Sequence, residues 1–211
     1  MGVVEGSLGG DNLHREVFEA LRSVVDKLAE GQTIIKTCEI DFDRDAFYGA
    51  ISSIDASELA FVIDKYQRRL GRPPRRDELD TYTSYKLQQG REMSGIDILH
   101  ALRCVQDTVK FVNDKLEKVD VLVTPVYVDR IPKLNILSPD QGERLDSRSK
   151  RMFPYTRIVN ACGNPAISIP AGLDSRGLPI GIQLVGQCGQ DLKLLRTAAR
   201  ITDPFVRAPL S

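Results

Sequence analysis

Two short apolar segments near the C-terminus, separated by a glycine-bounded turn, limit most strongly how this chain can fold. Residues 166–170 and 178–185 are rich in isoleucine, leucine and valine, and each has the length of a strand. The segment between them begins at Gly172 and ends at Gly177, and its composition is typical of a turn. The sequence therefore predicts an antiparallel pair of strands around which the rest of the fold is built.

Amphipathic helices alternate with further short strands over the rest of the chain. The clearest helix covers residues 94–116, where Ser94 and Asp97 form a capping-box pattern and apolar residues recur every three or four positions. Further elements are expected as helices at residues 12–30, 43–70, 77–89, 153–162 and 191–201, and as strands at 33–40 and 120–124. This alternation favours an α/β sandwich. The polar, proline-containing residues 129–150 are predicted to form a long loop.

The balance of charge excludes some classes of partner. The 211 residues, a length that suits a single domain over 1–211, include 29 Lys and Arg and 29 Asp and Glu, so the net charge is zero. No overall field attracts nucleic acid or an anionic membrane. One basic run lies between Arg68 and Arg76, and we interpret it as a solvated loop because no aromatic residues interleave with it. We therefore expect neither nucleic acid nor a membrane as a partner.

Hydropathy and cysteine content bear on the cellular location of the chain. No stretch approaches ~18 consecutive apolar residues, so no membrane-spanning helix is expected, and the N-terminus does not have the pattern of a signal peptide. The four cysteines are scattered, without a CxxC pair. Sparse cysteines in a chain of this length indicate free thiols and predict a cytoplasmic location.

Few residues have the types and spacing of an active centre. The glycine-rich residues 6–10 contain a single serine and are interpreted as a flexible turn. Ser52 and Ser53 fall within a predicted helix and are interpreted as packing polarity. His100 and Cys104 stand four residues apart on another, so a Cys–His nucleophile or half of a metal site remains a hypothesis.

The sequence also predicts no cofactor and no metal. The aspartates at positions 41, 43 and 45 imitate a calcium loop, but Ala46 stands where that loop needs glycine and Ser52 where it needs glutamate. Asp43 is instead expected to cap the helix that follows it. No phosphate-binding glycine loop or GxSxG nucleophile motif is found in the sequence.

Several segments resemble one known family in the same order. They read VDVLVTPV at residues 119–126, PAISIP at 165–170 and GLPIGIQLVG at 177–186, with Asn160 and Gly163 just before them. This pattern is similar to the C-terminal part of the amidase signature family, the Ser-cisSer-Lys amide hydrolases. The resemblance covers essentially the whole chain but less than half of a full amidase. It implies a partial amidase-type α/β/α sandwich around a mixed sheet.

The resemblance also implies what is missing. In the family, one serine attacks the amide, a second serine in a cis peptide relays the proton, and a neutral lysine serves as base. The segments that carry these groups are expected upstream of residue 1, so the resemblance assigns no catalytic residue here. It implies the C-terminal portion of a hydrolase of carboxylic amide C–N bonds, inactive alone. The alternative is a non-catalytic binding or assembly module that reuses the same half-fold.

The resemblance places a substrate-binding segment at residues 153–160. Phe153, Tyr155, Thr156 and Asn160 are the candidate residues of the acyl-binding cleft. Family members that act on glutamine have an acidic residue near the place of Phe153 and an arginine near that of Phe61. Because a charged substrate in a cleft needs a paired charge, these two phenylalanines disfavour free glutamine. They favour an apolar or aryl acyl amide, or a short nylon-type amide.

The expected partners follow from the half-fold. A small-molecule amide is expected as substrate if an N-terminal half completes the enzyme. A partial sheet leaves unpaired edges and apolar faces, which favour association. We therefore expect a homodimer or an association with a catalytic amidase chain.

Overall fold

A computed structural model describes residues 2–3, 13–30, 34–75 and 77–202. The chain divides into two compact units, where the length had suggested one domain. The first, which we call the sheet unit, comprises Met1–Phe42, Val109–Ile131 and Met152–Ser211. The second, the helical unit, comprises Asp43–Thr108 and Pro132–Arg151. Each unit is described separately below.

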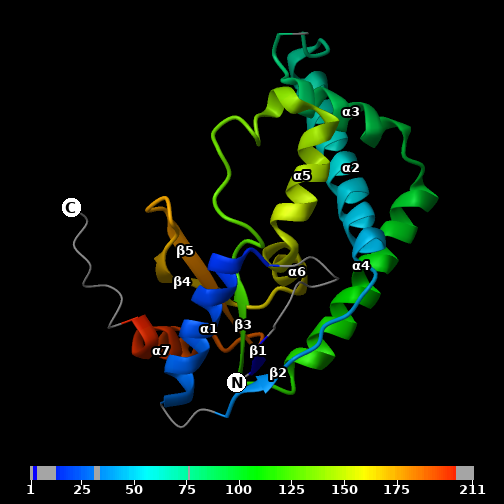
Figure 1. Ribbon diagram of the computed structural model, residues 1–211. Helices are drawn as coiled ribbons and strands as arrows, with labels where there is room; N and C mark the ends of the chain where they lie inside the picture. The colour runs from blue at the N-terminus through cyan, green and yellow to red at the C-terminus, as the bar shows by residue number, and fades with distance from the viewer. Residues whose placement is uncertain (1, 4–12, 31–33, 76, 203–211) are drawn as a thin grey trace. The chain divides into compact units, whose positions relative to one another are not determined.

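The sheet unit is built on a five-stranded mixed sheet in the order β2-β1-β3-β5-β4 (Figure 1). Its strands are β1 (Gly2–Val3), β2 (Lys36–Thr37), β3 (Val121–Pro125), β4 (Ala166–Leu173) and β5 (Pro179–Gly186). Strand β1 runs parallel to both β2 and β3, whereas β5 runs antiparallel to both β3 and β4. The mixed sheet and the antiparallel pair predicted from the sequence are therefore confirmed.

The register of the antiparallel pair shows why the sequence pattern was informative. Ile169 lies opposite Ile182, and Ile167 lies opposite Leu184. Because successive side chains of a strand point to opposite faces, these residues share one face of the sheet. Asp174 closes the connecting turn, where its backbone N–H donates to the Leu178 carbonyl over 2.7 Å.

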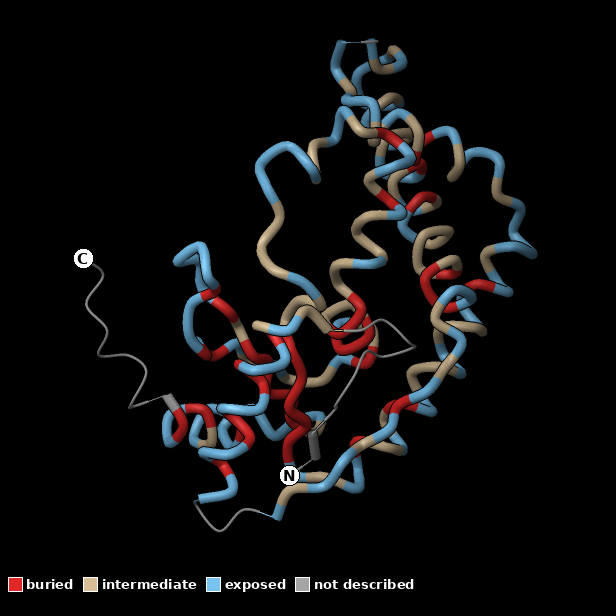
Figure 2. Tube along the Cα trace, in the orientation of Figure 1, coloured by how far each residue is buried: buried red, intermediate tan, exposed pale blue. Residues whose placement is uncertain are grey.

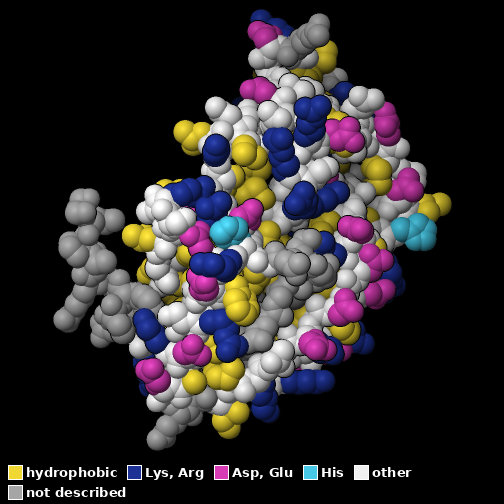
Figure 3. Space-filling model, in the orientation of Figure 1, with side chains coloured by type: hydrophobic (Ala, Val, Ile, Leu, Met, Phe, Trp, Pro, Cys, Tyr) yellow, Lys and Arg dark blue, Asp and Glu magenta, His cyan; other side chains and the backbone are white. Residues whose placement is uncertain are grey.

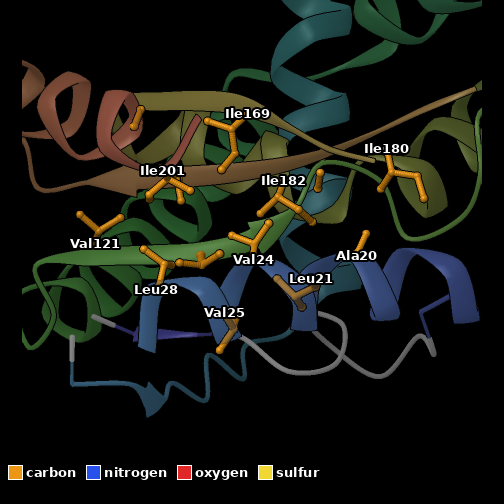
Figure 4. Close-up of a cluster of buried hydrophobic side chains, with 14 of the residues drawn as sticks. Ala20, Leu21, Val24, Val25, Leu28, Val121, Ile169, Ile180, Ile182 and Ile201 are labelled. Carbon is orange, nitrogen blue, oxygen red and sulfur yellow. The ribbon is translucent and has the colours of Figure 1, made fainter. Parts of the chain in front are cut away.

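The described part of the sheet unit contains the helices α1 (Arg15–Glu30), α6 (Pro154–Cys162) and α7 (Asp191–Thr202), together with the last part of α4 (Gly95–Leu116). Leu21 and Val24 of α1 are fully buried, and Figure 4 shows Val24 directed toward Ile182 of β5. Together with Leu194 and Ala198 of α7, these residues belong to one cluster of buried hydrophobic side chains. Burial of each large aliphatic side chain contributes roughly 1.5–3 kcal/mol. The sequence offers Asp11 or Asn12 as a cap for α1, and both lie outside the described residues.

Both faces of the central strands are buried, as Figure 2 shows for the sheet unit. All five residues of β3 are buried, and so are six of the eight in β5. The packing around Gly186 is tight, since a Cβ there would lie 3.3 Å from Pro165 and 3.4 Å from Leu194. The glycine thus marks a close approach, which is a common role of glycine in a strand.

The helical unit contains α2 (Arg44–Leu70), α3 (Thr81–Glu92), α5 (Glu143–Met152) and the first part of α4 (Gly95–Leu116). The predicted caps are confirmed: Asp43 accepts from the Ala46 N–H at 2.9 Å. At the start of α4, Ser94 and Asp97 exchange backbone and side-chain hydrogen bonds.

The long loop predicted for residues 129–150 is wrong over its second half. A 3₁₀ helix covers Pro139–Gln141, and α5 begins at Glu143. The sequence ERLDSRSKRM has too few apolar residues to show a helical pattern. Its acidic residues lie in the first turn and Lys150 and Arg151 in the last, an order that the helix dipole favours.

Gly90 lies inside a helix, although a glycine directly after the predicted helix 77–89 is typical of a helix stop. Helix α3 continues to Glu92, and a Cβ on Gly90 would lie 1.9 Å from the backbone oxygen of Ala56 in α2. The glycine therefore allows the two helix backbones to approach closely.

Helix α2 is also long and apolar enough to cross a membrane by length and composition alone. The same test is passed by core helices of soluble proteins, and α2 packs against α3. Its Ser52 takes part in the polar cluster described below.

Candidate functional site

The candidate substrate-binding residues lie on and beside α6. Phe153 precedes the helix, Pro154 starts it, and Gly163 ends it in the left-handed conformation with φ of 69°. Phe153 and Thr156 are half-buried and Asn160 is exposed, so all three retain accessible surface. Tyr155 is fully buried and packs inside the unit. The helix thus offers three of the four predicted residues as surface that a ligand can reach.

Tyr127 joins Phe153 as a second aromatic residue that the sequence reasoning missed. The two ring centroids are 5.4 Å apart with planes inclined by 57°. Tyr127 lies two residues after the Thr-Pro pair that ends β3, whereas Phe153 is distant in sequence. A lone tyrosine after a strand carries no signal of this pairing. The ring pair forms an apolar surface beside the start of α6, with the chemistry to contact an alkyl or aryl group.

A buried polar pair fixes the two strands near this segment. Gln183 of β5 donates from its side-chain amide to the Thr124 hydroxyl at 3.1 Å, and that hydroxyl donates to the Pro125 carbonyl at 3.1 Å. Thr124 lies opposite Gln183 in the β3–β5 register. A buried amide without a partner is costly, so this bond favours a single register.

Hydrogen bonds to a charged carboxylate stabilise the turn between β4 and β5. Arg176 donates to the Asp174 carboxylate through Nε at 2.9 Å, and the Leu178 backbone N–H donates to the same carboxylate at 3.0 Å. Burial raises the pKa of Asp174, but these hydrogen bonds outweigh burial and lower the pKa to about 2. Arg176 also donates to the Ile131 carbonyl, which ties the turn to the segment after β3.

A second polar cluster lies in the helical unit and has the residue types of a Ser–Lys centre. Lys86 donates to the Ser52 hydroxyl and forms an ion pair with Asp146 at 3.1 Å. Ser52 donates to the same carboxylate at 3.3 Å, and Tyr82 donates to it at 3.2 Å. Lys150 forms a second ion pair with Asp146 at 3.1 Å.

The geometry of this cluster argues against catalysis. Lys86 contacts Ser52 and is held in an ion pair with Asp146, which also pairs with Lys150. The Ser52 hydroxyl both accepts and donates within the cluster. Burial raises the pKa of Asp146, but the charge of Lys86 and the hydrogen bonds from both lysines outweigh burial. The net result is a lowered pKa. The interpretation of Ser52 as packing polarity therefore fits its contacts, which join α2, α3 and α5.

The remaining candidates gain no support from geometry. His100 is exposed and Cys104 half-buried on α4, and the Cys104 carbonyl accepts from Thr108 within the helix. Over residues 13–30, 34–75 and 77–202, together with 2–3, no group of three or more His, Cys, Asp or Glu could hold a metal ion. The glycine-rich residues 6–10 lie outside the described residues.

Surface charge is mixed over the face drawn in Figure 3. Lys and Arg side chains are interspersed there with Asp and Glu. This distribution agrees with the zero net charge of the sequence.

Comparison with known proteins finds one family over nearly the whole chain. A family model described as Amidase matches residues 1–195. The chain is 29% identical over 156 residues to the 6-aminohexanoate-cyclic-dimer hydrolase of Pseudomonas sp. (strain NK87), a match that covers 68% of this chain. It is 32% identical over 207 residues to a glutamyl-tRNA(Gln) amidotransferase polypeptide of Psychrobacter cryohalolentis, a match that covers 88% of this chain.

The solved structure of a 6-aminohexanoate cyclic dimer hydrolase shares the fold. Its TM-score is 0.81 at 24% identity, over 95% of this chain. The matches account for only 31% and 40% of the two curated relatives and 43% of the solved chain. The chain therefore spans less than half the length of these relatives.

Proposed function

The chain belongs to the amidase family, and we propose that it supplies the C-terminal portion of an enzyme that hydrolyses carboxylic amide C–N bonds. In this proposal the serine nucleophile, the relay serine and the lysine base come from another segment or another polypeptide. The chain contributes sheet strands, covering helices and part of the acyl-binding cleft. By itself it is inactive.

One observation carries this proposal. The chain matches an amidase over 95% of its own length but only 43% of the solved hydrolase, so it has the fold of a part of that enzyme. Ser52 and Lys86 share their contacts with Asp146 in a cluster that joins three helices, which supports a nucleophile from another segment. Together these observations favour a half-enzyme that needs completion.

The substrate class is proposed from the aromatic pair. Phe153 and Tyr127 present rings where a charged acyl group would need a paired charge. Phe61, on α2, is a further apolar residue where glutamine-specific members are expected to have arginine. A relative named for hydrolysis of a 6-aminohexanoate cyclic dimer agrees with an apolar amide substrate. We therefore favour alkyl or aryl acyl amides over free glutamine, and the cytoplasmic location expected from the cysteines belongs to the same proposal.

Co-expression tests the function. The chain is produced with the part of the Pseudomonas 6-aminohexanoate-cyclic-dimer hydrolase that it does not match, and the purified complex is assayed with the cyclic dimer and with acetanilide. We expect hydrolysis by the complex and none by either polypeptide alone. The control replaces the nucleophilic serine of the hydrolase segment by alanine.

Two outcomes would contradict the proposal. Hydrolysis by the isolated chain would show that it carries its own nucleophile. A stable complex without hydrolysis of either amide would favour the alternative, a binding or assembly module that reuses the half-fold.

A further inference from the structure

Among the residues that the structure describes, strand β4 has one open edge. In the described part of the chain it pairs only with β5, and it ends the sheet order. The Gly186 N–H donates to the Pro165 carbonyl at 2.9 Å, which identifies residues 165 and 186 as a hydrogen-bonded pair. Because such pairs alternate along an antiparallel ladder, Ile167 and Ile169 bond to β5. The backbone groups of Ala166, Ser168 and Pro170 therefore point to the open edge.

Proline usage agrees with this assignment. Pro170 lies within β4, where a missing N–H is tolerated only if it faces away from the paired strand. The open edge therefore offers the N–H and carbonyl groups of Ala166 and Ser168, followed by the carbonyl of Pro170. These three residues are exposed, whereas Val185 and Gln183, which lie opposite Ala166 and Ser168 on β5, are buried.

The two edges of the sheet differ in how they are protected. Exposed edges are usually blocked by charged side chains, above all lysine. At the β2 edge Lys36 is exposed, and the lining of a surface groove beside it includes Lys36, Lys115 and Lys118 together with Glu39. Residues 165–171 at the β4 edge carry no charge at all. Only the β4 edge thus has the character of a strand that is normally paired.

We propose that the open edge of β4 pairs with a strand from the remainder of an amidase fold. The inference rests on the proposed function and names the surface through which completion occurs. The occupant follows from length, since the matched hydrolase has more than half of its chain outside the region that this chain covers. A strand added to β4 forms backbone hydrogen bonds with Ala166 and Ser168 and covers the uncharged edge.

Hydrogen exchange of single amides tests this surface. The chain is compared alone and in complex with the unmatched segment of the Pseudomonas hydrolase, with residue-resolved detection over β4. We expect the Ala166 and Ser168 amides to exchange on the order of 100-fold more slowly in the complex. The Ile167 and Ile169 amides, already bonded to β5, serve as internal controls and are protected in both states.

A matched pair of variants tests the same edge independently. Ser168→Pro removes the outward N–H, whereas Ser168→Ala keeps it and makes a similarly small change in side chain. We expect Ser168→Pro to weaken binding of the hydrolase segment at least tenfold by titration, and Ser168→Ala to leave binding unchanged. If circular dichroism shows that Ser168→Pro does not fold, Ser168→Lys replaces it, because a lysine on an edge strand opposes strand addition.

The outcomes separate this inference from the proposed function. An active complex in which the Ala166 and Ser168 amides stay unprotected overturns the edge assignment and leaves the function intact. Protected amides in an inactive complex support the edge and contradict the function. Protection that appears in the chain alone as its concentration rises identifies a second copy as the occupant, and also overturns the inference.

Discussion

Thr124 and Gln183 join β3 to β5 through a buried hydrogen bond, with 3.1 Å between the hydroxyl and the side-chain amide. Both side chains are almost completely shielded from solvent. The pair lies within the strands that carry the family resemblance, so part of that signature serves register and stability.

Thr124→Val is expected to destabilise the fold by about 1–3 kcal/mol, because the Gln183 amide then remains buried without this partner. The double variant Thr124→Val with Gln183→Met replaces both partners by apolar groups of similar shape and is expected to recover most of that loss. Urea unfolding of the wild type, the two single variants and the double variant measures the coupling energy between the two residues. Additive losses would show that the bond does not couple the two residues.

Acid is expected to remove the contribution of Asp174. The pKa of Asp174 in the folded protein is lowered to about 2, so its stabilising contribution is complete above the unfolded pKa, near 4. That contribution is lost as the pH falls toward 2. The free energy of unfolding should therefore differ most between wild type and Asp174→Asn at neutral pH, and the two should converge between about pH 4 and pH 2.

Comparison with Asp174→Asn is needed because Glu78 titrates in the same range. The hydrogen bond from Arg72 lowers the pKa of Glu78 to about 2 as well. Both proteins keep Glu78, so its effect cancels in the difference. A difference that stays constant from pH 7 to pH 2 would contradict the assignment.

Gly90→Ala is expected to destabilise the helical unit by at least about 1–3 kcal/mol, since the new Cβ would overlap the Ala56 carbonyl and force the helices apart. Gly49→Ala, on α2, is the matched control, because a Cβ there meets nothing within 4 Å. That control is expected to stabilise α2 by up to about 1 kcal/mol. Thermal unfolding measures both, and equal effects would argue against the close helix contact.

Lys86→Met is expected to cost about 3 kcal/mol, because it leaves the buried Asp146 with Lys150 as its remaining ion-pair partner. Ser52→Ala is expected to be milder, about 1 kcal/mol, since it removes only hydrogen bonds. Denaturant unfolding ranks the two. In the completed enzyme, Ser52→Ala should leave amide hydrolysis unchanged, and loss of activity in a folded Ser52→Ala complex would make Ser52 the nucleophile after all.

Phe153→Ala in the completed enzyme is expected to raise KM for acetanilide roughly threefold to tenfold, as removal of an aromatic contact of ~0.5–1.5 kcal/mol would do. Tyr127→Ala should act in the same direction. Leu192→Ala, an exposed position on α7, is the control and should leave KM unchanged. Unchanged KM for both aromatic variants would remove the ring pair from the substrate site.

Sequence patterns predicted best where local rules decide the structure. The capping box at Ser94 and Asp97, the cap at Asp43 and the glycine after Cys162 located helix ends to within a residue or two. The strand pair followed from two apolar runs and a turn between them. These signals are contained in a few consecutive residues, so no knowledge of distant contacts was needed.

Other features depend on residues far apart in the chain. Helix α5 has few apolar residues and is secured by Asp146, whose partners include Lys86 and Ser52 on other helices. Gly90 looks like a helix stop until its contact with Ala56 is known. The Tyr127–Phe153 pair likewise joins segments that no periodicity connects. Each of these contacts is non-local, and the sequence of one element does not contain it.

The course of the chain between the two units has a consequence for how the protein can diversify. The backbone leaves the sheet unit after Phe42 and returns to it at Val109. It leaves again after Ile131 and returns at Met152. The helical unit is therefore an insertion made of two excursions. Lengthening either excursion costs only a slowly growing loop-closure entropy, so descendants can remodel the helices by insertion or deletion while the strand pairing is inherited intact.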